Sequence, residues 1–239
     1  MYDNSAKYYD ALYSFKNYRQ EADAIREYIL KQNPDVTSVL DVACGTGKHI
    51  EYLSHYFTVD GVDLNEKFIR IAKQRNPSSS FWCADMTTLH IDRKYDVVMC
   101  LFSSIAYVKT LESIRKTVNQ FIRHLTDNGI IIVEPWFTPE AWEPGFVSVL
   151  NSEYQDYKIS RMSHADRDGD ISILNFEYLV GSNQGIEHFK ERHELGLFEH
   201  NELVQVFRES RMKVEYDSYG ISGRGIYILR KFEEGGNSI

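Results

Sequence analysis

The sequence predicts an α/β protein whose doubly wound, mostly parallel sheet carries an antiparallel β insertion. Between Val36 and Glu134, short β-branched runs alternate with amphipathic helical patterns, as they do where helices connect parallel strands. A Gly-rich loop follows the first of these strands, a typical position for a ligand-binding loop. From Tyr154 to Leu197 the pattern changes to alternating apolar and polar residues with turn signals between them, which indicates antiparallel strands.

Helices and strands are expected to take turns through the first half of the chain. Tyr18–Lys31 carries apolar residues at helical spacing and stops before Asn33-Pro34, so it is expected to be the first helix. The strands expected after it are Val36–Val42, Phe57–Val62, Ser80–Cys83, Tyr95–Phe102 and Gly129–Glu134, and the helices are His49–Tyr56, Glu66–Asn76 and Leu111–Leu125. The carboxyl ends of these strands are therefore expected at one edge of the sheet.

The second half of the chain is expected to contain the insertion and the end of the large sheet. The inserted strands expected are Tyr154–Ser163, Ile171–Gly181 and Ile186–Leu197. Asn201–Arg211 returns to a helical pattern, and Lys213–Tyr219 and Gly225–Arg230 are expected to form an antiparallel hairpin at the sheet edge. We therefore assign residues 1–134 and 198–232 to an α/β core, 135–197 to the insertion and 233–239 to a disordered tail.

The charge balance and the apolar runs narrow the classes of partner. The 239 residues include 27 Lys and Arg against 35 Asp and Glu, a formal net charge of -8, and no Lys/Arg run stands out that would follow a phosphate backbone. No apolar run approaches the roughly 20 residues of a membrane span, and the N-terminus shows no secretory signal. The histidines lack metal-ligand spacing, and the three cysteines lack a paired motif. We expect a cytoplasmic protein with reduced cysteines that binds no metal, nucleic acid or membrane.

The Gly-rich loop and the end of the second strand form a candidate nucleoside site. The loop reads Asp41-Val42-Ala43-Cys44-Gly45-Thr46-Gly47, and glycines there let a ligand approach the backbone closely. Asp63 ends the second strand 22 positions after Asp41, where a carboxylate can accept both ribose hydroxyls of a nucleoside. Taken alone, the loop could be a plain turn and Asp63 a helix N-cap. Together they favour a nucleoside ligand.

The residues of this loop favour S-adenosylmethionine over a dinucleotide. Dinucleotide-binding loops use a third glycine next to the pyrophosphate, and this chain has Ile50 there. S-Adenosylmethionine has no phosphate; it needs a loop for its amino-acid part, an acid for its ribose, and polar and apolar contacts for adenine. Asp85 and Met86, after the third strand, can supply the adenine contacts, although a strand-end turn is the alternative role for Asp85.

Several motifs together resemble a known family. The Gly-rich loop, Asp63, Ala84-Asp85-Met86 and Tyr95-Asp96-Val97-Val98 are similar to the motifs of class I S-adenosylmethionine-dependent methyltransferases, which have a Rossmann-like fold. Nearly the whole chain further resembles the dTDP-amino-sugar N,N-dimethyltransferases of the macrolide desosamine and mycaminose pathways. The motifs behind this narrower resemblance are Tyr9-Asp10-Ala11-Leu12-Tyr13, Phe102-Ser103-Ser104-Ile105, Val133-Glu134-Pro135-Trp136-Phe137, Arg161-Met162-Ser163-His164 and Ser222-Gly223-Arg224-Gly225.

The resemblance implies which residues bind the methyl donor and the acceptor. The donor-binding residues would be Tyr18 or Arg19, Ala43, Gly45, Gly47, Asp63, Leu64, Asp85, Met86 and Leu101, the last at a position where relatives often carry Met. The acceptor, a dTDP-linked amino deoxysugar, would be bound by Tyr13, Trp136, Arg161, Ser163, Ser222 and Arg224, with the insertion as a lid. The catalytic residues would be Tyr13, Tyr107 and His164. Arg161 and Arg224 would clamp the pyrophosphate, because a guanidinium matches phosphate oxygens bidentately.

Single residues of this set also have structural explanations. Arginines on strands or turns more often form surface salt bridges, and single aromatic residues more often belong to a core. His164 and His193 are as well explained as strand-surface histidines as they are by an acceptor site. These alternatives stay open at the level of sequence.

The resemblance implies N-methylation of a small-molecule amine. The sulfonium already makes the methyl group electrophilic, so the enzyme chiefly aligns a neutral amine and excludes water. Tyr13 or His164 could accept the proton of an ammonium directly or through water. Two other functions stay open: a methyltransferase for another amine, hydroxyl or carboxylate, and a non-catalytic module that binds the donor. Whether the chain forms a homodimer also stays open.

Overall fold

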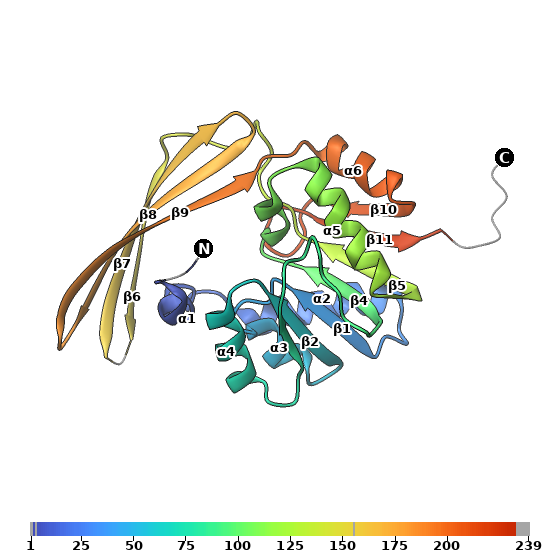
Figure 1. Ribbon diagram of the computed structural model, residues 1–239, viewed down its shortest axis with the longest axis horizontal. Helices are drawn as coiled ribbons and strands as arrows, with labels where there is room; N and C mark the ends of the chain where they lie inside the picture. Colours follow the sequence, from blue (N-terminus) through green and yellow to red (C-terminus); the bar gives the residue numbers. More distant parts are fainter. Residues whose placement is uncertain (1, 3, 155, 233–239) are drawn as a thin grey trace.

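The larger sheet has the parallel strand directions that the alternating pattern predicts. The computed structural model describes residues 2, 4–154 and 156–232 (Figure 1). Among these residues, seven strands form one sheet in the order β10-β11-β5-β4-β1-β2-β3. The strands are β1 Ser38–Val42, β2 Thr58–Asp63, β3 Phe81–Cys83, β4 Tyr95–Cys100, β5 Leu125–Val133, β10 Met212–Asp217 and β11 Ile226–Lys231. Strands β1 to β5 pair in parallel, and β11 pairs antiparallel with β5 and β10, so the predicted hairpin at the sheet edge is confirmed.

The chain reverses its winding direction between β1 and β4. From β1 it winds outward through β2 to β3, and from β4 it winds the other way to β5. Doubly wound sheets bind their ligands at such a switch point, beyond the carboxyl ends of the strands. The Gly-rich loop after β1 and the loop after β4 meet there.

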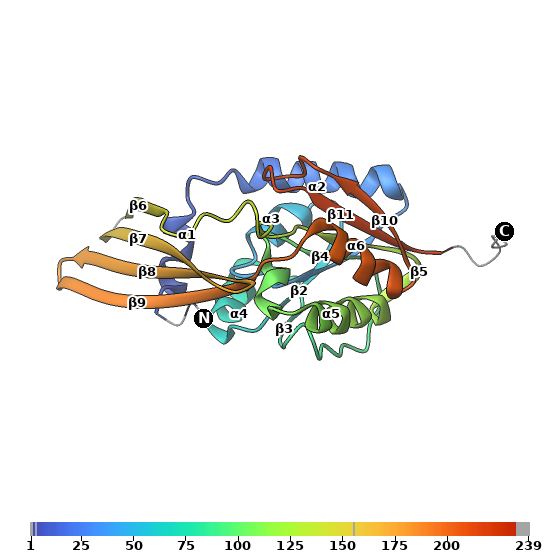
Figure 2. The same ribbon diagram turned by 90° about the horizontal axis from the view of Figure 1, so that it is seen from above.

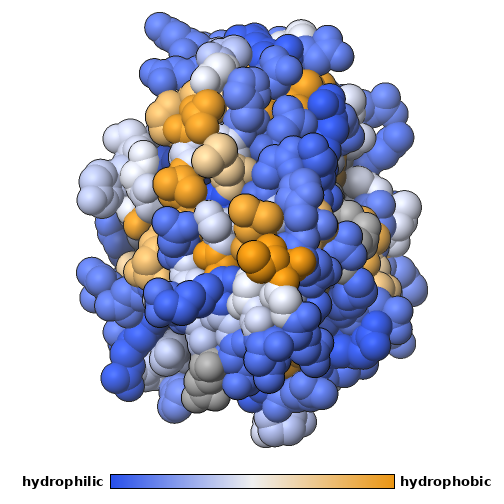
Figure 3. Space-filling model, turned by 90° about the vertical axis from the view of Figure 1, so that its left-hand side faces the viewer, coloured by the Kyte–Doolittle hydropathy of each residue, from blue (hydrophilic) through white to orange (hydrophobic). Residues whose placement is uncertain are grey.

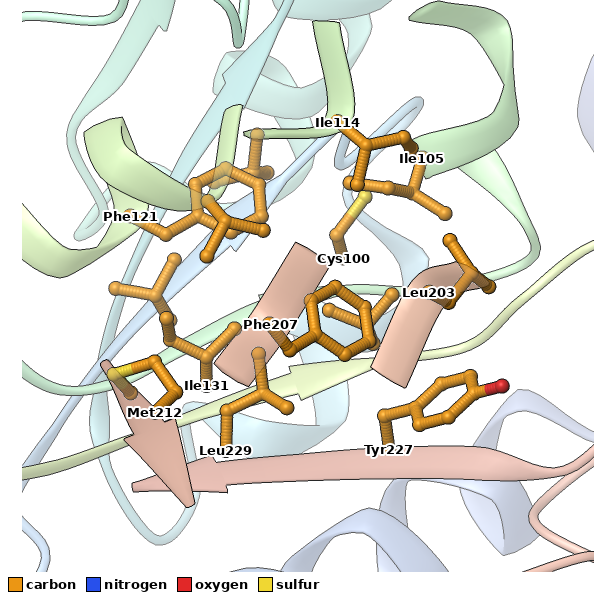
Figure 4. Close-up of a cluster of buried hydrophobic side chains, with 14 of the residues drawn as sticks. Cys100, Ile105, Ile114, Phe121, Ile131, Leu203, Phe207, Met212, Tyr227 and Leu229 are labelled. Atoms are coloured by element: carbon orange, nitrogen blue, oxygen red, sulfur yellow. The ribbon is translucent and has the colours of Figure 1, made fainter. Parts of the chain in front are cut away.

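Helices cover both faces of this sheet (Figure 2). The helices α2 Tyr18–Gln32, α3 Lys48–Leu53 and α4 Glu66–Arg75 pack on one face, and α5 Leu111–Arg123 and α6 His200–Glu209 pack on the other. Figure 4 shows the buried cluster on the face covered by α5 and α6, in which Phe121 of α5 and Phe207 of α6 lie over side chains of β5 and β11. Both phenylalanines are fully buried, and burial of such a side chain stabilises the fold by about 1.5–3 kcal/mol.

The inserted residues form a second sheet, which is antiparallel. Within the described ranges it has four strands in sequential order, β6 Val147–Tyr154, β7 Tyr157–Asp168, β8 Ile171–Ser182 and β9 Gly185–Gly196. The sequence predicted three strands, so it missed β6 and placed β7 too early. The exposed face of β6 carries Val147 and Val149, whereas Ser148 and Ser152 lie on its covered face. The strand therefore lacks the usual pattern of a half-buried strand.

The first residues of the chain pack on the inserted sheet as well as on the Gly-rich loop. The short helices η1 Ala6–Tyr8 and α1 Tyr9–Leu12 lie between the inserted sheet and the larger one (Figure 1). One buried cluster joins Tyr8, Leu12 and Tyr13 to Ile159, Phe176, Tyr178 and Val180 of the inserted sheet. Asp10 accepts a hydrogen bond from the Thr46 hydroxyl (2.6 Å) and another from Arg75. The sequence placed this segment in the α/β core, and the structure shows that it bridges both sheets; the domain boundaries themselves stay a prediction.

The outward face of the inserted sheet mixes polar and apolar side chains. Figure 3 views the end of the molecule formed by this sheet, where apolar patches lie among hydrophilic ones. The apolar side chains of this sheet that are more than half exposed include Val147, Val149, Met162 and Leu179.

None of the helices in the described part of the chain combines the length and apolar character of a membrane span. A cytoplasmic location and a homodimer stay predictions, and the predicted tail at 233–239 lies outside the described residues.

Candidate active site

A cavity of about 1160 Å³ opens where the two sheets meet. It is lined by the loop after β1, by the turns after β2, β3 and β4, by the N-terminal segment, by inward-facing residues of the inserted sheet and by the loop before β11. The predicted site residues on its wall are Tyr13, Ala43, Gly45, Asp63, Leu64, Asp85, Met86, Tyr107, Trp136, Arg161, Ser163 and Arg224. Residues that lie far apart in the sequence therefore meet in one space.

Asp63 is built into the Gly-rich loop. Its Oδ2 accepts a hydrogen bond from the Gly45 N–H (2.9 Å), and its Oδ1 accepts one from the Asn65 N–H (2.7 Å). Gly45 has a φ of 56°, and a Cβ there would meet nothing within 4 Å, so the backbone conformation and not crowding favours glycine. Burial raises the pKa of Asp63, while hydrogen bonds from the Asn65 and Gly45 N–H groups oppose that shift. The result is a fixed carboxylate that faces the cavity with acceptor capacity left.

Asp41 lies buried at the base of this loop. It is 2% exposed, and its Oδ2 has no hydrogen-bond partner among the described residues. Burial, together with the nearby charge of Asp63, raises the pKa of the Asp41 carboxyl well above its usual range. The folded protein therefore favours the protonated form of Asp41 more than the unfolded chain does.

The turn after β3 combines the two roles that the sequence left open for Asp85. Its Oδ1 accepts hydrogen bonds from the Thr87 N–H (2.7 Å) and the Thr87 hydroxyl (2.8 Å), so Asp85 organises a strand-end turn. The same residue lines the cavity together with Met86. A carboxylate and a thioether thus face the space next to Asp63.

Two partly buried arginines lie among aromatic rings on the cavity wall. Arg161 of β7 donates to the Tyr13 hydroxyl (3.0 Å) and lies 4.5 Å from the ring centre of Phe176. Arg224 lies 3.6 Å from Glu134 and 5.7 Å from the ring centre of Trp136. The Nε atoms of both arginines are buried without a hydrogen-bond partner among the described residues. Neither arginine is a surface salt-bridge residue, and both retain donors for an anionic ligand.

Glu134 holds the loop after β4 and the loop before β11 together. Its carboxylate accepts hydrogen bonds from the Phe102 N–H (2.6 Å) and from the Ser222 hydroxyl, and it pairs with Arg224. Phe102 and Ser103 both have positive φ values, 52° and 61°, a strained conformation for such residues. Glu134 therefore stabilises this strained turn and also sets the position of Arg224.

Comparison with known proteins gives the family of this chain. Residues 39–129 match the family model of a methyltransferase domain. The chain is 34% identical over 233 residues to dTDP-3-amino-3,4,6-trideoxy-alpha-D-glucopyranose N,N-dimethyltransferase of Streptomyces venezuelae. The match covers 95% of this chain and 98% of the relative. It is 33% identical over 226 residues to dTDP-3-amino-3,6-dideoxy-alpha-D-glucopyranose N,N-dimethyltransferase of Streptomyces fradiae, which covers 93% of this chain and 89% of the relative. The chain belongs to the dTDP-amino-sugar N,N-dimethyltransferase family.

A solved structure supports the fold and the cofactor of this methyltransferase. CalS10, an amino pentose methyltransferase from Micromonospora echinaspora involved in calicheamicin biosynthesis, has been solved with S-adenosylmethionine bound. It has a TM-score of 0.82 to this chain at 28% identity, and the match covers 91% of this chain and 92% of CalS10. The predicted Rossmann-like fold, the enzyme class and the use of S-adenosylmethionine are confirmed.

Some predicted donor-site residues of this methyltransferase lie outside the cavity wall. Tyr18 and Arg19 open α2; Tyr18 packs beside His49, and Arg19 is exposed. Gly47 packs against the C-terminal end of α4, because a Cβ there would lie 3.1 Å from the Cβ of Ala72 and 2.7 Å from a side-chain atom of Asn76, the residue after the helix. Leu101 belongs to a buried hydrophobic cluster under the sheet. Gly47 and Leu101 thus have packing roles in this structure.

Two predicted acceptor-site residues also lie elsewhere. His164 is exposed on the outward face of β7, because alternate residues of a strand point to opposite faces and Ser163 points inward. A direct catalytic role for His164 therefore finds no support in the geometry. Ser222 is exposed and reaches the site only through its hydrogen bond to Glu134.

Several aromatic residues of the cavity wall were given no site role from the sequence. These are Tyr2, Tyr9, Phe102, Phe137, Trp142 and Phe176. The motifs that contain Tyr9, Phe102 and Phe137 were visible in the sequence, but a place on the wall depends on how the chain folds back. Among the described residues, no group of three His, Cys, Asp or Glu side chains is placed to hold a metal ion.

Proposed function

We propose that this methyltransferase transfers a methyl group from S-adenosylmethionine to the amino group of a dTDP-linked amino deoxysugar. The observation that carries the proposal is a pair of partly buried arginines, Arg161 and Arg224, whose Nε atoms are unpartnered among the described residues, on the same cavity wall as Asp63. Guanidinium groups match phosphate oxygens bidentately, so the pair suits a diphosphate. The two Streptomyces relatives are dTDP-amino-sugar N,N-dimethyltransferases.

The donor would occupy the part of the cavity nearest the Gly-rich loop. Asp63 would accept hydrogen bonds from both ribose hydroxyls, Asp85 would accept from the adenine amino group, and Met86 would lie against the adenine ring. Ala43 and Gly45, both with positive φ, would let the backbone approach the amino-acid part of the donor. When bound, the donor supplies an electrophilic methyl group on a sulfonium.

The acceptor would lie between the arginines and the donor pocket. Tyr13, which is 9% exposed, and Trp136 would cover the sugar and exclude water. By holding the acceptor amine next to the donor's methyl group, these residues would lower the barrier to methyl transfer by several kcal/mol. Ser163 would add a hydroxyl to the wall beside Arg161, although its own hydrogen bond to Ser148 (2.6 Å) already occupies part of its capacity.

Kinetics with and without the nucleotide test the proposal. A dTDP-amino sugar is compared with the same amino sugar lacking the nucleotide, in wild type and in Arg161→Ala and Arg224→Ala. Loss of a charge-assisted contact worth about 1.5–3 kcal/mol should raise KM for the nucleotide substrate roughly 10- to 100-fold and leave donor affinity unchanged. Arg192→Ala is the control, because Arg192 is exposed and pairs with Glu194. Normal kinetics in both variants, or equal turnover of the free sugar, would contradict the proposal.

A further inference from the structure

A chain of three polar side chains leads from the cavity wall into the inserted sheet. Tyr107, in the helical turn η2 Ser104–Val108, lines the cavity, and its hydroxyl lies 2.9 Å from Nδ1 of His193. The Nε2 atom of His193 lies 3.6 Å from Oε2 of Glu191. His193 and Glu191 share the inward face of β9 because they are two positions apart. The His193 side chain is 0% exposed and does not itself line the cavity.

Glu191 determines where the protons of this chain lie. Its carboxylate accepts hydrogen bonds from the Asn4 N–H (3.0 Å), the Ser5 N–H (3.1 Å) and the Ser5 hydroxyl (2.6 Å). Burial acts to raise the pKa of Glu191, but the His193 ring, whose Nε2 lies 3.6 Å away, and the hydrogen bonds from Ser5 lower it to about 2, so the carboxylate is ionised near neutral pH. An anionic neighbour favours a proton on Nε2 of His193. Nδ1 is then the acceptor, and the Tyr107 hydroxyl donates to it.

The groups that face this chain from other elements are mainly aromatic. The ring centre of His193 lies 4.4 Å from that of Tyr2 and 5.0 Å from that of Phe176 on β8. Burial raises the pKa of Tyr107, so its hydroxyl is neutral and can pass on a proton only by exchanging it for its own. Besides His193, the titratable groups around Tyr107 are Tyr2, Tyr13, Tyr178 and Glu191.

We propose that Tyr107, His193 and Glu191 form a proton relay that deprotonates the acceptor amine before methyl transfer. The inference rests on the proposed function, because the acceptor must be an amine. An aliphatic amine is largely protonated near neutral pH and must lose that proton before its lone pair can attack. The buried His193 and the anionic Glu191 next to it give the proton of the ammonium a destination behind the cavity wall.

The relay transfers two protons in concert, one from the ammonium to Tyr107 and one from Tyr107 to His193. The oxygen of Tyr107 accepts a proton from the ammonium nitrogen while the original O–H proton of Tyr107 moves to Nδ1 of His193. The N–H bond of the ammonium breaks, its electron pair becomes the lone pair that attacks the methyl group, and Tyr107 ends as a neutral phenol. His193 becomes an imidazolium that the Glu191 carboxylate stabilises, and it returns its proton to solvent after the product leaves. Tyr107 is the catalytic residue of this step, and His193 and Glu191 are positioning residues that act through it.

The pH profile of kcat/KM distinguishes a relay from a structural role. His193→Gln, Glu191→Gln and Tyr107→Phe are compared with wild type on a dTDP-amino sugar. Near neutral pH we expect each variant to lose roughly 100-fold, the lower end of the range for proton-transfer catalysis. The loss should shrink to within about threefold above the pKa of the amine, where the substrate arrives neutral and the relay is not needed. His188→Gln is the matched control, because His188 lies on the same strand and pairs with Glu177 (2.7 Å) on the exposed face.

A double variant gives a second, independent readout. Residues of one relay act as a unit, so Tyr107→Phe combined with His193→Gln should lose no more than the more impaired single variant. Losses that multiply, losses of the same factor at every pH, or unchanged rates would each overturn the relay. If circular dichroism shows that His193→Gln does not fold, Tyr107→Phe decides, since it keeps the ring and removes only the hydroxyl. A wild type that methylates hydroxyl acceptors and no amino sugar would instead overturn the proposed function, and the relay with it.

Discussion

Replacing Asp63 by Ala is expected to weaken S-adenosylmethionine binding on the order of 100-fold or more. Each oxygen of the Asp63 carboxylate already accepts one backbone N–H, from Gly45 at 2.9 Å and from Asn65 at 2.7 Å. A carboxylate has about four acceptor sites, so about two remain for the two ribose hydroxyls. Charge-assisted hydrogen bonds contribute about 1.5–3 kcal/mol each, so two of them give at least about 3 kcal/mol, or roughly 150-fold in Kd.

Titration calorimetry of the donor with wild type and Asp63→Ala measures this loss. Asp63→Asn should fall between them, because the amide keeps the shape and loses the charge and one acceptor oxygen. Asp170→Ala is the control, since that side chain is 84% exposed in the turn before β8. Burial raises the pKa of Asp63, so on acidification its carboxylate becomes protonated at a higher pH than that of an ordinary aspartate. Donor affinity should therefore begin to fall at that higher pH. A Kd for folded Asp63→Ala within about threefold of wild type would refute the ribose contact.

Three further variants test buried or strained positions. The pKa of Asp41 is higher in the folded than in the unfolded protein, so wild-type stability should fall as pH rises from about 4 through the raised pKa. Asp41→Asn should therefore raise Tm more at alkaline pH than at pH 4, and a Tm difference between variant and wild type that is the same at every pH would contradict this. Gly47→Ala places a Cβ 2.7 Å from Asn76 at a φ of 73°, so it should lower stability by roughly 1–3 kcal/mol in thermal unfolding while donor affinity of the folded variant stays within about threefold; unchanged Tm would count against the packing role. Tyr13→Phe removes the hydroxyl that Arg161 contacts and should raise acceptor KM by about 10-fold or less, whereas a loss in kcat of about 10² to 10⁴ would make Tyr13 the obligate base.

The α/β core was predictable because each of its strands carries a strong local signal. Residues 97–100 of β4 and 130–133 of β5 are apolar runs buried on both faces, and the helices between strands show a clear apolar stripe. β6 was missed because its valines face outward and its covered side carries serines. What stabilises β6 is its pairing with β7, a contact that a single segment of sequence does not encode.

The donor side of the candidate site was also predictable, whereas the acceptor side needed the resemblance. Asp63 ends β2 and Asp85 follows β3, and the carboxyl ends of parallel strands meet at one edge of a sheet. Arg161 and Arg224 come from an inserted strand and a late loop, so only the tertiary fold brings them to one wall. The prediction for His164 had the right strand motif but the wrong face. His193, two strands away and inward-facing, is the histidine that the fold brings next to Tyr107.

Transfer of an isotope-labelled methyl group shows directly whether this enzyme methylates the nitrogen of a dTDP-linked amino sugar. Purified protein is incubated with S-adenosylmethionine labelled at the methyl carbon and with a panel of dTDP-linked amino deoxysugars, and the products are examined by mass spectrometry and carbon NMR. If the protein is the proposed N-methyltransferase, at least one dTDP-amino sugar gains the mass of one or two methyl groups, with the label on nitrogen. Label on an oxygen, or transfer only to acceptors without a nucleotide, would contradict it.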